Sequence, residues 1–404
     1  MTNGVNLTRV YRVCWAGMVA AVQNERVVPG LAQQVSTRVV FFIAGFSVGV
    51  WAPLIPYVKS RAVLNEAQLG FLLLCLGVGS ILVMPVTGML ASRLGCRVVI
   101  GVSAFLLALC LPLLATLSSV PLLAMTLFVF GAALGTADVT VNVQATIVER
   151  ASGRALMSGF HGLYSVGGLV GSSALSGLLW LGLSPLLAIC LASVLIVLLL
   201  ARFAKDLLPY GNVSESHEPL FAFPRGKVLL IGALCFVTFL AEGSMLDWGA
   251  LFLSTLRGLA ESKAGLGYAS FAVAMTVGRL FGDKIVEALG GKTILVGGGL
   301  CAATGLALVV LVPLVPIALL GFTLVGLGCS NIVPVLFTQA GRQKIMPVGL
   351  ALSAITTIGY TGILIGPASI GFVAHATNLA LAMGLVALSL LAIPLSAQKV
   401  MSPN

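Results

Sequence analysis

Ionisable side chains are rare in this chain, so the few that interrupt long apolar stretches are the best candidates for chemistry. Of 404 residues, 59% are hydrophobic and only 8% are charged. Asp138 and Asn142 are four residues apart, which places them on one face of a helix. A carboxyl group among apolar residues can exchange protons or bind a polar solute, or it can serve as a structural contact between helices. We expect Asp138 to exchange protons.

Two further groups are expected to share in proton coupling. His161 lies in the next apolar stretch, where an imidazole can relay protons, donate a hydrogen bond or cap a neighbouring helix. Glu242 and Asp247 are five residues apart, or about 500° of helical rotation, so they point to different faces. Glu242 is nearer the middle of its stretch and is expected to join the coupling, whereas Asp247 is expected to serve a gate or a structural contact.

Aromatic and amide side chains in the same stretches are candidates for binding a solute. An indole ring can stack on the apolar face of a sugar, while phenol and amide groups can hydrogen-bond to its hydroxyls. The expected solute-binding residues are Asn142, Trp51, Tyr164, Trp248, Asn331 and Tyr360. The two tryptophans could instead belong to the aromatic belt at a membrane surface.

The remaining charged candidates are expected to hold helices together or to form a gate. Arg279 and Asp283 have the i, i+4 spacing of an ion pair within one helix. Arg93, Arg97 and Glu287 lie close to the ends of apolar stretches and are assigned to the same gate or structural group.

The sequence shows no arrangement typical of an enzyme, a metal site or a nucleotide-binding loop. The eight cysteines are scattered without a CxxC pair, and His161, His217 and His375 are far apart. The phosphate-binding pattern GxxxxGK[ST] is absent from the sequence. We therefore expect no enzymatic activity, no metal, no cofactor and no transport driven by ATP.

These candidate residues must be positioned by membrane helices. A soluble domain carries about 25% charged residues, far more than this chain, and apolar runs of this length argue against a membrane β-barrel. The predicted fold class is an all-α polytopic membrane protein in a lipid bilayer. Its twelve spans are predicted at 37–57, 67–91, 98–117, 121–147, 156–180, 185–204, 228–254, 264–288, 293–312, 315–340, 347–373 and 376–396.

The distribution of basic residues predicts the orientation of these spans. With the N-terminus placed inside, seventeen Lys and Arg residues fall inside, whereas only Lys59, Arg61, Arg257 and Lys263 fall outside. This bias predicts that both termini are cytoplasmic, with a tail over 1–35 and another over 397–404. It also accounts for the net charge of +10 without a nucleic-acid partner.

The two halves of the chain resemble each other. Trp51 and Trp248 are 197 positions apart, and Asp138 and Asn331 are 193 apart, each ending a GxxD or GxxN pattern. The triplets GCR (95–97) and GGK (290–292) match at 195 positions. Several pairs at nearly one offset predict two six-helix bundles in parallel repeat, 36–204 and 227–396, joined by a cytoplasmic linker at 205–226.

Residues 36–396 resemble the major facilitator superfamily. The segment GMLASRLGCR (88–97) is similar to the GxxxDRxGRR loop of that family, which braces the inner ends of helices. Ser92 stands where the family usually has Asp, and in the second half Glu287 and Lys292 occupy the acidic and basic positions. The resemblance implies a site between the two bundles that opens alternately to each side of the membrane.

Three stretches carry a closer resemblance, to the MosC/YbjJ-like transporters near L-fucose permease. They are AEGSMLDWGALFL (241–253), FHGLYSVGGLVGS (160–172) and GTADVTVNVQATIVER (135–150). Fucose permease has an acidic residue in span four followed four positions later by Asn, which Asp138 and Asn142 match. It also has an acidic residue in span one, where residues 37–57 have none.

The resemblance implies a monomeric secondary transporter of the bacterial inner membrane. Its expected substrate is a small polar solute, such as a sugar, a polyol or a derivative, carried by symport with protons. Two alternatives stay open, namely a proton-coupled exporter of lipophilic compounds and a non-transporting receptor on the same fold.

Overall fold

The computed structural model is helical throughout the regular elements of the residues that it describes, which are 28–64, 66–211, 223–259, 263 and 265–402. Within these residues, eleven helical segments are long and apolar enough to cross a membrane. The shorter apolar helix Leu266–Leu280 takes the place of the predicted eighth span. The all-α membrane fold class is therefore confirmed. The predicted tail over 1–35 and the linker over 205–226 lie partly outside the described residues.

The first group of helices contains six predicted spans, and its first span is interrupted. Pro53 and Pro56 lack a backbone N–H, so the helix tightens into a short 3₁₀ turn before it continues. The elements are α2 (Leu31–Trp51), η1 (Ala52–Leu54), α3 (Ile55–Arg61), α4 (Glu66–Leu94), α5 (Cys96–Thr116), α6 (Val120–Ser152), α7 (Met157–Trp180), α8 (Pro185–Phe203) and the turn η2 (Ala204–Asp206).

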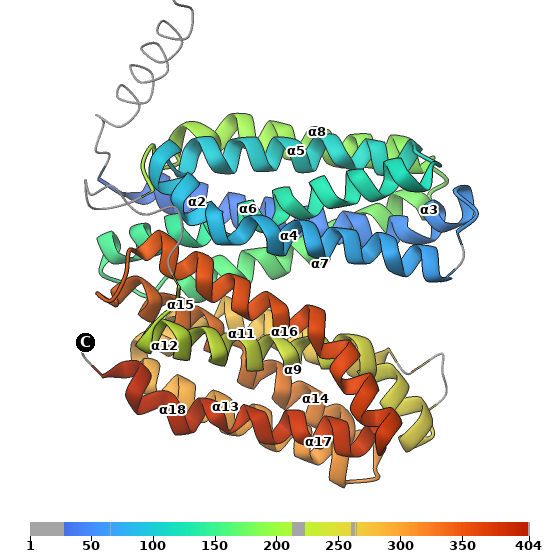
Figure 1. The fold of residues 1–404 in the computed structure, drawn as a ribbon, viewed down its shortest axis with the longest axis vertical. Coiled ribbons are helices and arrows are strands. Elements are labelled where there is room, and N and C mark those ends of the chain that lie inside the picture. The colour runs from blue at the N-terminus through green and yellow to red at the C-terminus, as the bar shows by residue number, and fades with distance from the viewer. Residues whose placement is uncertain (1–27, 65, 212–222, 260–262, 264, 403–404) are drawn as a thin grey trace, which may run out of the picture.

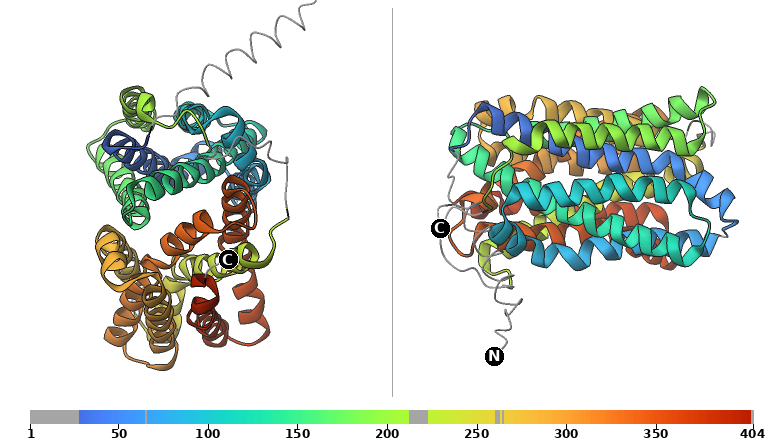
Figure 2. Two further views of the ribbon diagram at one scale, coloured as in Figure 1. Left: turned by 90° about the vertical axis from the view of Figure 1, so that its left-hand side faces the viewer. Right: turned by 90° about the horizontal axis from the view of Figure 1, so that it is seen from above.

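The second group contains the other six spans, three of which are divided in two. Its elements are α9 (Gly226–Arg257), α11 (Leu266–Leu280), α12 (Gly282–Leu289), α13 (Gly291–Leu311), α14 (Val315–Ser330), α15 (Ile332–Arg342), α16 (Val348–Ala376), α17 (Leu379–Leu390) and α18 (Ala392–Met401). Figure 1 shows α2 to α8 together above α9 to α18, and the end-on view in Figure 2 shows the two groups side by side. We call the end where α8 leads into residues 204–226 the linker end, and the opposite end the far end.

Two of the divided spans in the second group break at neighbouring points, one between α11 and α12 and the other between α14 and α15. Pro334 has no N–H to offer the carbonyl oxygen of Ser330, so the helix breaks between α14 and α15. The freed carbonyl of Ser330 accepts the Nε–H of Arg279 at 3.3 Å. Asn331, at the break itself, donates through Nδ2 to the carbonyl oxygen of Gly278 near the end of α11. The breaks therefore expose backbone acceptors to polar side chains within an apolar bundle.

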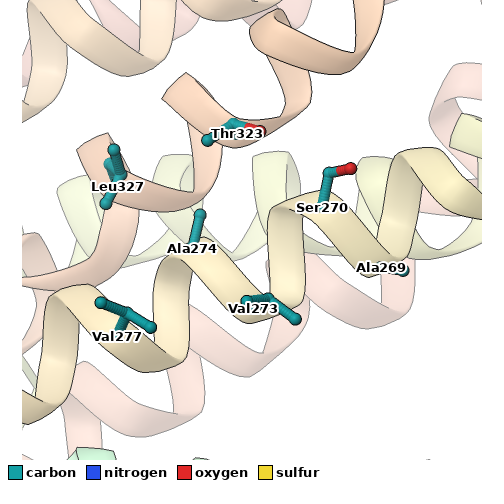
Figure 3. Close-up of a pocket in the computed structure, with 7 residues that line it drawn as sticks. All are labelled: Ala269, Ser270, Val273, Ala274, Val277, Thr323 and Leu327. Atoms are coloured by element: carbon teal, nitrogen blue, oxygen red, sulfur yellow. The ribbon is translucent and has the colours of Figure 1, made fainter.

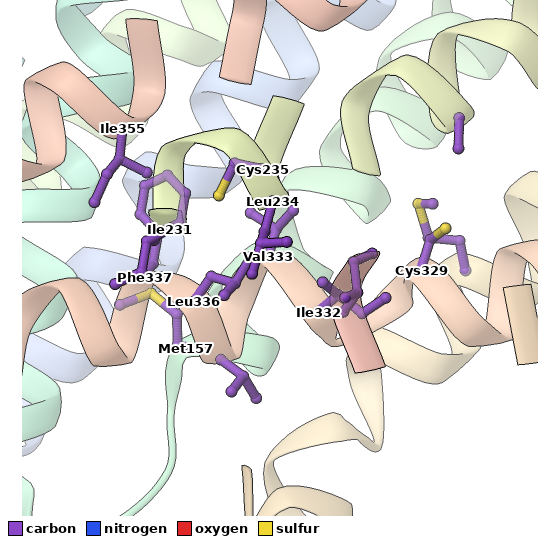
Figure 4. Close-up of a cluster of buried hydrophobic side chains, with 14 of the residues drawn as sticks. Met157, Ile231, Leu234, Cys235, Cys329, Ile332, Val333, Leu336, Phe337 and Ile355 are labelled. Carbon is purple, nitrogen blue, oxygen red and sulfur yellow. The ribbon is translucent and has the colours of Figure 1, made fainter. Parts of the chain in front are cut away.

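One cluster of buried apolar side chains extends from the first group into the second. Figure 4 shows Met157 of α7 near Leu336 and Phe337 of α15, with Ile231 of α9 beside them. All four side chains are at most 2% exposed. Since Met157 begins α7, this contact holds the two groups together at the linker end.

At the far end, two arginines cap the last turns of neighbouring helices. The guanidinium group of Arg61 donates to carbonyl oxygens at the end of α5 at 2.6–3.2 Å. Arg257 does the same at the end of α13, at 2.6 and 2.7 Å. The last carbonyls of a helix lack helical partners and carry partial negative charge, so a guanidinium suits them. The two arginines are 196 positions apart, which extends the internal repeat to these caps.

Replacing either capping arginine should destabilise the protein. We expect Arg61→Met and Arg257→Met each to cost about 1–3 kcal/mol, because partly buried carbonyl oxygens lose charged donors. The measurement is the Tm of the purified protein in detergent. Arg202→Met is the matched control. The side chain of Arg202 is 64% exposed, and it contacts only its neighbours Asp206, at 3.9 Å, and the ring of Phe203 among the described residues. Shifts in Tm no larger than that of the control would contradict the capping role.

Candidate functional site

The structure brings together the predicted residues of spans four and five. Asn142 of α6 donates through Nδ2 to the carbonyl oxygen of Asp138 at 2.8 Å. Its Oδ1 faces Nε2 of His161 on α7 at 3.1 Å. An amide oxygen can only accept, so Nε2 carries the proton of the imidazole. The rings of Phe41 and Phe337 flank the imidazole, with centroids 5.3 and 5.8 Å away.

The carboxyl group of Asp138 is the chemically exceptional member of this cluster. The residue is 8% exposed, and among the described residues its carboxyl group forms neither a hydrogen bond nor an ion pair. Tyr164 of α7 and Tyr360 of α16 lie within electrostatic range of it. An unpartnered carboxylate is costly inside a membrane, so this group is suited to taking up a proton or a polar ligand.

A second polar cluster surrounds Arg279, and it overturns the predicted Arg279–Asp283 ion pair. Nη2 of Arg279 lies 3.4 Å from Oε1 of Glu242 on α9, and Nη1 donates to Oγ of Ser165 on α7 at 3.1 Å. The i, i+4 geometry is lost because the span breaks between α11 and α12. Asp283, beyond the break, instead accepts the N–H of Gly159 at 3.0 Å.

Helix α7 lies between the two polar clusters. His161 faces Asn142 within the first group, and Ser165, one turn further along α7, contacts Arg279 of the second group. The hydroxyl of Ser165 also donates to the carbonyl oxygen of His161 at 3.3 Å. Movement of α7 relative to α11 would therefore break the contact between Ser165 and Arg279.

Three carboxylates converge on the beginning of α7 at the linker end. Glu149 accepts N–H groups of residues 156 and 157 at 2.9 and 2.8 Å, and Asp283 and Glu287 accept those of residues 159 and 155. Glu287 also pairs with Arg154 at 3.6 Å. The first N–H groups of a helix have no helical partner and carry partial positive charge, which favours carboxylates. Asp283 and Glu287 come from the other helix group, and their gating role stays a prediction.

Glu149 was not among the predicted site residues, although it is central to this contact. It is 4% exposed, and its Oε1 accepts the hydroxyl of Thr338 on α15 at 2.6 Å. The next residue, Arg150, donates to the carbonyl oxygen of Gly341 at 3.1 Å. The sequence does contain a Glu-Arg pair at the end of the stretch GTADVTVNVQATIVER. From sequence alone, however, that pair marks only the end of a span.

Two glycine contacts between the groups follow the internal repeat. The N–H of Gly88 on α4 donates to Oγ of Ser353 on α16 at 2.7 Å. Gly282, 194 positions after Gly88, packs against Ser158 of α7, and a Cβ at Gly282 would lie 2.5 Å from the Cβ of Ser158. Both contacts require glycine because the helices approach so closely, and together they place equivalent surfaces of the two halves at the interface.

Several predicted residues occupy other surroundings. Trp51 is 5% exposed and belongs to an apolar cluster within the first group. Trp248 lies against Gly371 of α16, and its buried Nε1 has no hydrogen-bond partner among the described residues. Asp247 is exposed. Asn331 is engaged at the helix break described above. Their predicted roles in binding or gating remain untested.

The arginines of the loop after span two lie at the linker end. Arg97 donates through Nε to the carbonyl oxygen of Leu207 at 3.0 Å and through Nη2 to that of Lys205 at 2.6 Å. It therefore fixes the chain that leaves α8. Arg93 also has an interaction partner.

Tyr360, a predicted solute-binding residue of α16, packs edge-on against Phe239 of α9, with ring centroids 5.9 Å apart.

A shallow groove outside these clusters lies between α11 and α14. Figure 3 shows its lining, which consists of Ala269, Ser270, Val273, Ala274, Val277, Thr323 and Leu327. Since none of these side chains is ionisable, the groove adds nothing to the polar clusters. Within the described residues, no group of three or more His, Cys, Asp or Glu side chains could hold a metal ion.

Comparison with known proteins identifies the family. The model of the Major Facilitator Superfamily matches residues 39–367. The chain belongs to the Major Facilitator Superfamily. It is therefore a multi-pass membrane transporter, as the resemblance of its loop and its repeat implied.

Relatives within the superfamily agree with the branch inferred from the sequence. The chain is 55% identical over 384 residues to an uncharacterised MFS-type transporter of Yersinia pestis, covering 95% of this chain and 100% of the relative. It is 30% identical over 344 residues to membrane protein MosC of Rhizobium meliloti, covering 85% and 84%. These matches confirm the MosC-like resemblance.

Solved structures share the fold of this superfamily member. The E. coli fucose:proton symporter FucP has a TM-score of 0.75 at 18% identity, covering 92% of this chain and 99% of that chain. The proton:xylose symporter XylE has a TM-score of 0.70 at 15% identity, covering 91% and 95%. At these identities the likeness shows the fold alone.

Loss of the Thr338 hydroxyl should loosen the linker end of this transporter. Thr338→Val removes the donor to Glu149 but leaves the cap on α7, so we expect the interface to open roughly fivefold more often, for a bond worth about 1 kcal/mol. The measurement is the rate at which maleimide labels Met157→Cys in a variant without other cysteines.

The control for this experiment is Thr377→Val. Thr377 lies after α16 at the far end and bonds only within its own chain segment, to Val373 at 2.6 Å. Equal labelling rates in the two variants would show that the hydroxyl of Thr338 does not hold the interface closed.

Proposed function

We propose that this transporter carries a small polar solute, such as a sugar, a polyol or a derivative, into the bacterial cell by symport with protons. In this proposal the protein works as a monomer in the inner membrane with both termini in the cytoplasm. Its partners are the lipid bilayer, protons and the solute, and nucleic acid is not among them. The basic residues at the linker end support this orientation.

The unpartnered carboxyl group of Asp138 is the observation that carries the proposal. Asp138 lies two residues from the middle of the 33-residue helix α6, so it is close to the centre of the membrane. In transporters of this architecture, substrate and coupling ions bind near that level, between the two repeats. A proton neutralises the carboxyl group and so removes the cost of moving it through the closed state.

The surroundings of Asp138 favour a solute rich in hydroxyl groups. The phenol groups of Tyr164 and Tyr360 can donate to and accept from such a solute, and the ring of Phe239 beside Tyr360 offers an apolar face. The names of the fucose and xylose symporters that share the fold support the same class of solute.

The contacts at the linker end support alternating access. Glu149, Asp283 and Glu287 each bond to the opposite helix group there. These bonds must break before a solute can leave on that side. In our proposal they form the inner gate. Rocking of the two groups would break these contacts and close the far end.

A second candidate function is proton-coupled export of a lipophilic compound. The aromatic rings of Phe41 and Phe337 beside His161 favour it, because they would accommodate an apolar ligand next to a buried carboxyl group. A non-transporting receptor would bind a ligand without moving protons.

Ligand-induced thermal stabilisation tests the class of solute. A panel of sugars, polyols, amino sugars and lipophilic cations is added to the purified protein. We expect a rise in Tm with a sugar-class ligand and its loss or marked reduction in Asp138→Asn, because that variant lacks the carboxylate. Asp206→Asn, which alters a partly exposed carboxylate at the linker end, is the control. Stabilisation by lipophilic cations alone would favour the exporter instead.

Proton movement tests the direction of coupling. The protein is reconstituted in vesicles, and a gradient of the stabilising ligand is imposed while the internal pH is followed. Symport predicts that protons move with the ligand, and antiport predicts the opposite sign. A ligand that binds without any proton movement in the wild type would contradict both and favour the receptor.

A further inference from the structure

Arg279 is a positive charge inside the membrane whose three acceptors come from three different helices. Its Nε donates to the carbonyl oxygen of Ser330 on α14, its Nη2 lies 3.4 Å from Glu242 on α9, and its Nη1 donates to Ser165 on α7. The residue is 7% exposed. A guanidinium group placed so deeply needs a counter-charge, and Glu242 is the carboxylate that supplies it.

The two buried carboxyl groups therefore occupy opposite electrostatic environments. Glu242 has a cation within ion-pair distance, whereas Asp138 has none among the described residues. When two titratable groups differ in this way, the one without a cation changes its protonation state more readily. Protonation of Glu242 would leave the guanidinium group without a counter-charge, while protonation of Asp138 would remove an uncompensated charge.

The groups that surround the two carboxylates agree with this division. The titratable neighbours of Glu242 besides Arg279 are Tyr268 on α11, Cys235 on α9, Cys329 on α14, and Tyr164 and Tyr360 on α7 and α16. Phenol and thiol groups are neutral near pH 7, so none competes with the guanidinium. The helices packed on α6 carry their arginines near the linker end, at Arg38, Arg93, Arg97 and Arg342. The titratable groups that face Asp138 from α7 and α16 are the phenols of Tyr164 and Tyr360, while His161 of α7 directs its Nε2 to Asn142.

We propose that Arg279 is a positioning residue that keeps Glu242 ionised, so that of the two carboxyl groups Asp138 is the one that exchanges protons. The same guanidinium group ties α11 to α7 across the interface through Ser165. Glu242 is then a fixed counter-charge for the bridge between the two helix groups and takes no part in carrying the proton. This inference rests on the proposed proton coupling at Asp138.

Infrared spectroscopy of the protein in lipid tests the division without any substrate. The carbonyl-stretch band of a protonated carboxylic acid is compared between acidic and alkaline pH. All carboxyl groups contribute to this band at acidic pH, so each variant is compared with the wild type. We expect Asp138→Asn to lose one component of the pH-dependent change and Glu242→Gln to keep the full change. A component that is lost in Glu242→Gln but kept in Asp138→Asn would overturn the proposal.

Arg279→Gln provides the sharper test. Without its cation, Glu242 should take up a proton, so a second protonated-carboxyl band should appear that is absent from the wild type. That band should vanish in the double variant Glu242→Gln with Arg279→Gln, while the band of Asp138 remains. A purely structural Arg279 would lower Tm without producing the second band, and this result would overturn the proposal.

The double variant also guards against a failure to fold. Glu242→Gln leaves the guanidinium group without its counter-charge, and Arg279→Gln leaves a carboxyl group that must take up a proton. The double change removes both groups, so we expect its Tm to exceed that of either single variant. A Tm of the double variant below both would contradict the pairing.

The outcomes separate this inference from the proposed function. If the bands behave as expected and no ligand stabilises the protein, the pairing stands and the transport proposal fails. If a sugar-class ligand binds and depends on Asp138, but the second band never appears in Arg279→Gln, the transport proposal stands and the role of Arg279 is wrong.

Discussion

A charge in the membrane needs a partner, and this constraint decides where the helices of this transporter meet. The guanidinium group of Arg279 satisfies it by drawing on α9, α14 and α7 together, which links the core of the second group to the first. A break in the tenth span makes this possible, because Pro334 leaves the carbonyl oxygen of Ser330 without a helical partner. The carboxyl group of Asp138 is left unsatisfied, and so it is the place where the chain can respond to a proton or a solute.

The beginning of α7 is the second point on which the architecture depends. Carboxylates from both helix groups share its free N–H groups, so one helix end serves as a common binding surface for the two halves. Such a contact is strong when closed and leaves few unsatisfied groups when opened, because water can reach the linker end and replace the carboxylates from the other group. Further along the same helix, His161 and Ser165 contact the two polar clusters. Helix α7 thus connects the closure at the linker end with the groups near the membrane centre.

The sequence was sufficient for the fold class, the repeat and the shared face of Asp138 and Asn142, because these depend on hydropathy and on spacing within one helix. The contact of Asn142 with His161 depends on how α6 and α7 pack, which spacing does not encode. The predicted pairing of Arg279 with Asp283 was wrong because it assumed a continuous helix. Glu149 was missed because its partners, Thr338 and the start of α7, are set by tertiary contacts.

The pairing of Glu242 with Arg279 has an electrical consequence. The pair is neutral as a unit, so its displacement across the membrane field involves almost no electrical work. If Asp138 alone changes its charge, the site is neutral when it holds a proton and carries one negative charge when it is empty. Moving one elementary charge across a membrane potential of 100 mV involves about 2.3 kcal/mol of electrical work. With the cell interior negative, the voltage would therefore act on the return of the empty site toward the outside and leave the loaded step almost untouched.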